Sequence, residues 1–237
     1  MARRERRGAK GPRKRAAAFA KATASHAEAK RRRAGAGRGA PATENARAKA
    51  VEGTLRDAAR LHERAAGESV DAVIAVADAL QTAFGSGAKV LIFGNGGSAA
   101  DAQHFACELV GRFLRERRAM PAIALTADTT AVTAIANDYG FDRVFARQIE
   151  AHGRPGDVAV GISTSGTSAN VLAGLQYAKS RGLKTVAFTG GNGGPIGAAA
   201  DLHVNVPHDL TPRVQEVHRT LIHAVCDLVE QHLDGNG

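Results

Sequence analysis

The chain has 237 residues, of which 44% are hydrophobic and 4% aromatic, with no Trp, so its core must consist of Val, Ile, Leu and Ala. The formal net charge of +9 is uneven, because residues 1–50 hold 16 Lys and Arg against three acids, while the remainder holds 16 basic and 20 acidic residues. A mildly acidic body argues against a nucleic-acid-binding fold. Two cysteines, no run of 18 apolar residues and no apolar signal core favour a reducing, cytoplasmic location.

The basic residues concentrate in a segment that we predict to be a disordered tail, residues 1–41. Phe19 is its only large apolar side chain, so folding would bury too little surface to offset the ordering entropy. Residues upstream of the true start and a nucleic-acid-binding arm remain the alternatives for this segment. Residues 42–237 are predicted to form one domain.

Short apolar runs alternate with helical patterns from about Thr43 onward. This alternation predicts a doubly wound, mostly parallel five-stranded α/β sheet flanked by helices, with two N-terminal helices outside the sheet. The expected strands are 90–93, 122–125, 158–162, 185–188 and 202–206. The expected helices are 43–65, 68–84, 98–113, 129–136, 141–151, 168–180 and 212–233.

Two small polar loops follow predicted strands, where parallel sheets bind ligands. The first, 94–98 (GNGGS), exposes backbone N–H groups to an anion, with Ser98 as the expected cap of the next helix. It fits a dinucleotide fingerprint only weakly, because no acidic residue ends the next strand, and no Lys follows as in a P-loop. The second, 163–168 (STSGTS), carries five hydroxyls that suit a phosphate monoester. A flexible turn capped by Ser168 is the alternative reading of the second loop.

Ionisable side chains follow the first loop at helical spacing. His104, Glu108 and Arg112 recur every four residues and should share one helix face, where His and Glu can bind a metal or move a proton. The alternative is a solvated stripe with a Glu108–Arg112 ion pair.

The last predicted helix carries Gln215, His218 and His223, and both histidines could simply be surface residues. Gln215 and His223 are eight residues apart, roughly 12 Å along a helix, so we expect them to reach a common ion that lies above a helix of another subunit. Asn137 and Asp138 form an expected loop that could meet a sugar hydroxyl, or an ordinary turn.

Taken together, these stretches resemble the phosphoheptose isomerase family of the sugar-isomerase (SIS) fold. The matching segments are LIFGNGGSAADAQHFACELVGRF, PAIALTAD, AIANDYGFD, GDVAVGISTSGTSANV, FTGGNGG and RVQEVHRTLIH. The resemblance implies conversion of sedoheptulose 7-phosphate to D-glycero-D-manno-heptose 7-phosphate through an enediol. It also implies one zinc ion per subunit and a homotetramer with active sites between subunits.

The family's site residues carry over by position. Glu108 and His223 would be the catalytic acid/base pair. The implied zinc ligands are His104, Glu108, Gln215 and His223. The implied substrate contacts are Asn95, Gly96, Gly97, Glu108, Asn137, Asp138, Ser163, Thr164, Ser165, Ser168 and Gln215.

Two features depart from the isomerase pattern. The stretch SAADAQHFA resembles a non-catalytic SIS protein that associates with the replication initiator, so a phosphosugar-binding regulator is the alternative function. Glu108 and His223, which that branch typically lacks, favour the enzyme. Pro212 stands where some isomerases carry an Asp three residues before the Gln.

Overall fold

The computed structural model describes residues 44–234, and the tail predicted at residues 1–41 lies outside the described residues. The first described segment is a charged helix, α2, and among residues 44–234 every helix is too short or too polar to span a bilayer. The elements, in order, are α2 (Glu44–Glu68), α3 (Val70–Gly85), β1 (Val90–Gly94), α4 (Gly97–Val110), β2 (Ala122–Ala124), α5 (Thr129–Tyr139), η1 (Phe141–Arg143), α6 (Val144–His152), β3 (Val158–Ser163), α7 (Ala169–Ser180), β4 (Lys184–Gly190), α8 (Gly194–Ala199), β5 (Leu202–Val206) and α9 (Thr211–Asp234).

The five strands form one parallel sheet in the order β2-β1-β3-β4-β5. The chain leaves β1 outward to β2 and then returns to the other side of β1 with β3. The strand order therefore reverses between β1 and β3, and a crevice opens beyond the carboxyl ends of strands at such a switch point. The two polar loops follow these two strands, so the topology brings them to the same place.

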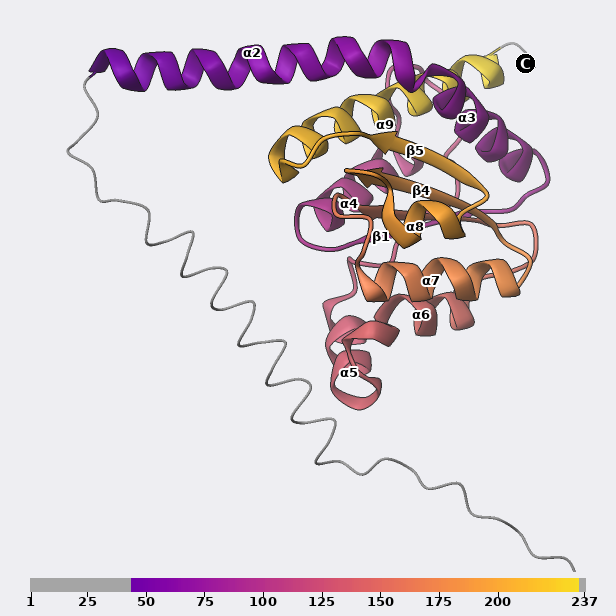
Figure 1. Ribbon diagram of the computed structural model, residues 1–237. Helices are drawn as coiled ribbons and strands as arrows, with labels where there is room; N and C mark the ends of the chain where they lie inside the picture. The colour runs from indigo at the N-terminus through magenta and orange to yellow at the C-terminus, as the bar shows by residue number, and fades with distance from the viewer. Residues whose placement is uncertain (1–43, 235–237) are drawn as a thin grey trace, which may run out of the picture. The chain divides into compact units, whose positions relative to one another are not determined.

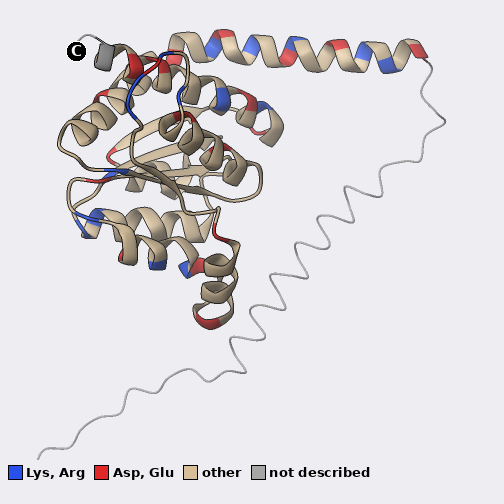
Figure 2. Cartoon of the chain, turned by 180° about the vertical axis from the view of Figure 1, so that it is seen from behind, with Lys and Arg blue, Asp and Glu red and all other residues tan. Residues whose placement is uncertain are grey.

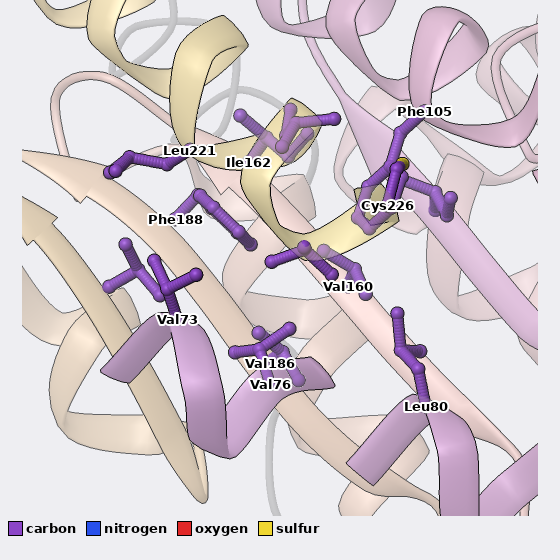
Figure 3. Packing of buried hydrophobic residues seen from close by; sticks show 14 of the residues in the cluster. Val73, Val76, Leu80, Phe105, Val160, Ile162, Val186, Phe188, Leu221 and Cys226 are labelled. Carbon is purple, nitrogen blue, oxygen red and sulfur yellow. The ribbon is translucent and has the colours of Figure 1, made fainter. Parts of the chain in front are cut away.

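Helices cover both faces of the sheet, as Figure 1 shows, and each face has its own apolar core. On one face α3, α4 and α9 pack on the sheet, and Figure 3 shows Val76, Phe105 and Cys226 from these helices around Val160 and Val186. On the other face α5 to α8 pack around Phe93 and Leu175. In the described strands Lys184, at the start of β4, is the only Lys, Arg, Asp or Glu, and the other charged residues lie on helices and loops (Figure 2). The predicted doubly wound α/β fold is confirmed.

Most predicted boundaries agree with the structure to within a few residues, and two differ for physical reasons. The six-residue helix α8 was not predicted, since a Gly-Gly-Pro opening resembles a turn. The helix expected over 98–113 ends at Val110. Arg112 therefore does not continue the face of His104 and Glu108, and it pairs with Glu116 rather than with Glu108.

Glu230 of α9 explains why the chain turns away after α4. This carboxylate is 1% exposed and accepts the backbone N–H groups of Phe113, Leu114 and Arg115 at 2.8–2.9 Å. Arg117 adds a charged donor at 3.0 Å. Burial raises the pKa of Glu230, but these four donors outweigh burial and hold the pKa below its usual value. The loop after α4 is thereby fixed to α9.

We expect Glu230→Gln to lower the free energy of unfolding by roughly 1–3 kcal/mol at pH 7, because an amide supplies one acceptor oxygen and no charge to four donors. A carboxyl whose folded pKa is depressed contributes stability above its unfolded pKa, and this contribution is lost as pH falls through the folded pKa. The difference in free energy of unfolding between wild type and variant, measured by urea unfolding, should therefore shrink from pH 5 toward pH 3. Glu150→Gln, which changes a surface pair on α6, is the control, and equal stability of Glu230→Gln and wild type at pH 7 would contradict the assignment.

Candidate active site

A pair of asparagine side chains joins the two polar loops across the switch point. The Asn95 amide donates to Asn170 Oδ1 at 2.8 Å, and the Asn170 amide donates back to Asn95 Oδ1 at 2.9 Å. Asn170 is 2% exposed in the first turn of α7, and its Oδ1 also accepts the N–H of Val171. The reciprocal pair fixes the loop after β1 relative to the loop after β3, so the two loops form one site.

Three serine hydroxyls gather at the end of β3. Ser163 Oγ lies 3.0 Å from Ser168 Oγ and 3.3 Å from Ser165 Oγ. Ser168 stands at the N-cap of α7, as the alternative expects, but its hydroxyl contacts Ser163 and makes no cap bond to the helix. Hydroxyls grouped beside a helix N-terminus match the acceptor-rich surface of a phosphate.

The adjoining backbone is packed too closely for larger residues. A Cβ on Gly166, which has a φ of +66°, would lie 2.4 Å from the Gly193 carbonyl oxygen. Thr164 and Ser165 also border a polar cavity of about 360 Å³ that extends to Asn192 and His208. The hydroxyl loop therefore rests on the turn after β4 and remains open on its other side.

The start of α4 differs from the expected cap. Gly96, with a φ of +55°, occupies the N-cap, whereas Ser98 lies inside the first turn, is buried and makes no cap bond. The amide of Gln215 lies directly over Gly97, since a Cβ there would be 2.1 Å from Gln215 Nε2. The expected Ser98 cap is thus wrong, and the missing side chain at Gly97 makes room for Gln215.

Two histidines from α4 and α9 face each other. His104 Nε2 lies 2.7 Å from His223 Nε2 and 3.4 Å from Glu108 Oε1. The Phe113 ring lies 5.2 Å, centroid to centroid, from that of His223. A contact of 2.7 Å between two ring nitrogens needs one donor and one acceptor, so at least one Nε2 is unprotonated. Burial, together with the nearby Arg219 charge, lowers the pKa of His104 and keeps this ring neutral.

The donor set fits a transition-metal ion. His104, Cys107 and Glu108 each offer a ligand atom, and the three atoms lie within 4.8 Å of one another. His223 adds a second imidazole, and neutral imidazole with carboxylate is a ligand combination typical of zinc. Cys107 was not predicted as a candidate, and burial raises the pKa of its thiol, which disfavours the thiolate that metals bind.

Comparison with known proteins places these residues in a family. The SIS domain model matches residues 55–190. The phosphoheptose isomerase of Geotalea daltonii is 58% identical over 163 residues, which cover 69% of this chain and 85% of that protein. The chain belongs to the phosphoheptose isomerase family.

Solved structures of family members agree with the described fold. The Neisseria gonorrhoeae phosphoheptose isomerase has a TM-score of 0.74 at 45% identity, covering 77% of this chain and 98% of that one. The Francisella tularensis phosphoheptose isomerase has a TM-score of 0.75 at 35% identity, covering 77% and 97%. These relatives do not favour the non-catalytic regulator as the alternative function.

Relative to this isomerase site, some predicted residues lie elsewhere. Asn137 and Asp138 belong to the last turn of α5 rather than to a loop, and both are exposed, bonded to each other at 2.8 Å. Helix α5 packs on the face of the sheet opposite α9 (Figure 1). These two residues are therefore not brought together with the histidines within one chain.

The described chain bears on two further expectations and adds residues that the sequence did not reveal. Within one chain, the helix that faces Gln215 and His223 is α4, whereas a helix from another subunit was expected there, and the contribution of a second subunit stays a prediction. His218 is not a surface residue, since it is fully buried, bonds to the Thr189 carbonyl, and has its pKa lowered by burial to about 4. Asn170 was not predicted, because an Asn in a first helical turn has no distinctive pattern.

We expect Gly97→Ala to displace Gln215 without disturbing α4, because the clash is with a flexible side chain. Isomerase activity should fall at least ~10-fold, since small misplacements at a reacting centre are costly, while the melting temperature changes little. Gly53→Ala in α2, where an added Cβ meets nothing within 4 Å, is the matched control and should keep full activity. Unchanged activity in Gly97→Ala would show that the position of Gln215 is unimportant.

Proposed function

We propose that the protein is an aldose–ketose isomerase that converts sedoheptulose 7-phosphate to D-glycero-D-manno-heptose 7-phosphate. The observation that carries this proposal is the meeting of His104, Glu108 and His223 within hydrogen-bonding range on α4 and α9. This proton-transfer group lies on α4 and α9, and α4 begins directly after the loop that the Asn95–Asn170 pair joins to the serine loop, at the end of the sheet where parallel sheets bind ligands. A phosphate site beside acid and base groups is what the isomerisation of a phosphosugar requires.

The serine loop would hold the phosphate. Ser163, Thr164, Ser165 and Ser168 supply hydroxyls, and the N-terminus of α7 supplies N–H groups and a favourable dipole. Asn95, Gly96 and Gly97 line the other side of the switch point, where the carbon chain would lie. Holding the phosphate fixes the open-chain sugar relative to α4 and α9.

Glu108 and His223 would transfer the protons. Glu108 removes a proton from the carbon beside the carbonyl, which gives an enediol, and returns it to the neighbouring carbon. His223 moves a proton between the two oxygens, a task suited to a neutral imidazole with one free nitrogen. Each transfer contributes ~10²–10⁴-fold to the rate. Gln215, placed over Gly97, would orient a substrate hydroxyl.

We also propose that His104, Glu108, Gln215 and His223 hold a zinc ion. When bound, zinc would polarise the carbonyl group and stabilise the negative charge that develops on its oxygen in the transition state. Two imidazoles and a carboxylate close to one another support this assignment.

A homotetramer in the cytoplasm completes the proposal, and an apolar groove supports the association. A cavity of about 360 Å³ lies between the end of α2, α3 and α9. Val70 and Ile74 at its edge are 51% and 44% exposed, which is unusual for large apolar side chains on adjacent helical turns. A second copy of the chain would bury this surface. Asn137 and Asp138, exposed on α5, would then be substrate contacts only if a neighbouring subunit brings them to the site.

Glu108→Gln preserves the size of the side chain and removes the base. We expect turnover of sedoheptulose 7-phosphate to fall at least ~10²-fold while calorimetry still detects sugar-phosphate binding. Glu116→Gln, at a carboxylate whose side chain is 90% exposed just beyond α4, is the control and should keep full turnover. Near-normal turnover in Glu108→Gln would remove Glu108 from the mechanism, and no turnover by the wild type would overturn the proposed function.

Because Glu108 and His223 converge on His104 of their own chain, each chain should supply its own pair. We therefore expect no recovery of activity when the inactive variants Glu108→Gln and His223→Ala are unfolded together and refolded into mixed oligomers. Mass spectrometry should establish that the oligomers are mixed. Recovered activity well above that of either parent would mean that the pair is assembled from two chains.

A further inference from the structure

An ion pair with a buried carboxylate lies one helical turn before the two facing histidines. Asp101 of α4 is 3% exposed, and its Oδ1 accepts Arg219 Nε at 3.0 Å and Nη2 at 2.5 Å. Arg219 belongs to α9, where its side chain is 38% exposed. Neither residue is assigned to the proton transfers or to the metal site described above.

The pair is one contact in a series along two helices. Gln215 lies over Gly97, Arg219 bonds to Asp101, and His223 meets His104. Residue numbers rise together on both helices, so α4 and α9 run in the same direction, side by side on one face of the sheet (Figure 1). Asp101 stands three residues before His104 and Arg219 four before His223, which places the ion pair and the imidazole pair on the same faces of their helices.

Apolar packing alone does not determine how far α9 is shifted along α4. The contacts of Phe105 and Leu109 with Ile222 and Cys226 are non-directional and tolerate small axial shifts. A guanidinium that donates two hydrogen bonds to one carboxylate is directional and fixes both the distance and the axial position.

The ion pair is also poorly placed to serve stability. Asp101 Oδ2 is buried without a hydrogen-bond partner among the described residues. Buried pairs with unsatisfied oxygens are commonly no better for stability than apolar residues of similar size. The presence of a charged pair between α4 and α9 is therefore better explained by its effect on the relative position of these helices than by a gain in stability.

We propose that Asp101 and Arg219 are a positioning pair that sets the register of α9 against α4 and so holds His223 Nε2 at His104 Nε2. They act through the helices, at the wall of a cavity of about 520 Å³ that they line together with Gly97 and Gln215. The inference deepens the proposed isomerase function, and it also makes a structural claim that is independent of turnover.

The test uses Asp101→Asn, Arg219→Gln and the conservative Arg219→Lys, with Arg147→Gln as the control. Arg147 forms an ion pair with Glu150 on α6, on the opposite face of the sheet. The first readout is the downfield imidazole N–H proton signal expected from the 2.7 Å contact between His104 and His223. It is measured by NMR in the full-length protein without substrate and after chelation of any bound metal, because metal binding would displace this proton. His223→Ala identifies this signal by abolishing it.

We expect the signal to be lost or shifted in Asp101→Asn and Arg219→Gln, partly restored in Arg219→Lys, and unchanged in Arg147→Gln. In the second readout, kcat should fall at least ~10-fold with KM within about threefold, as for residues that orient reacting groups. Melting temperatures should fall, because removing one partner leaves the other unpaired, but every variant should remain folded at the temperature of the measurements.

An unaltered imidazole signal in Asp101→Asn and Arg219→Gln would overturn the proposal. So would a failure of these variants to fold, because the pair would then be a stabilising element rather than a positioning one. If the wild type shows the signal but no isomerase turnover, the proposed function fails while the NMR comparison still decides the role of the ion pair.

Discussion

The packing of α4 against α9 is the contact on which the site depends. These helices are far apart in the sequence. Asp101 contacts Arg219, 118 residues further along the chain, and His104 contacts His223, 119 residues further along. Both helices also bury apolar faces against the same side of the sheet, so the core brings α4 and α9 together and the Asp101–Arg219 pair sets their relative axial position. A core substitution that shifts α9 would therefore change the distance between His104 and His223 even where the domain still folds.

The second constraint is the switch point between β1 and β3. Parallel strands have their carboxyl ends at the same edge of the sheet. The loops at residues 94–98 and 163–168 therefore meet there even if their own residues make no contact. The Asn95–Asn170 pair then fixes the position of one loop relative to the other, since the two reciprocal amide hydrogen bonds form only in one arrangement of the side chains. The loop that leads into α4 is thereby coupled to the first turn of α7, a helix on the opposite face of the sheet.

The sequence was sufficient where the determinants are local. Apolar runs located all five strands, and the glycine and hydroxyl loops were recognised because they follow those runs. The sequence was insufficient where a residue far away in the chain determines the local structure. The end of α4 depends on Glu230, more than 110 residues away, and the partner of Gln215 depends on the direction in which α9 returns. Asp101, Arg219 and Asn170 likewise gain their roles only from partners on other elements.

The geometry around His104 also bears on how Glu108 can serve as a base. His104 Nε2 is close to both His223 Nε2, at 2.7 Å, and Glu108 Oε1, at 3.4 Å, but a single N–H can point to only one of them. While the imidazoles share that proton, Glu108 has no short bond to His104 and keeps its lone pairs for a substrate C–H. Metal binding at these residues would displace the proton between the imidazoles and would use Glu108 as a ligand. The roles of ligand and base therefore compete for Glu108, and the i,i+4 spacing from His104 creates this competition.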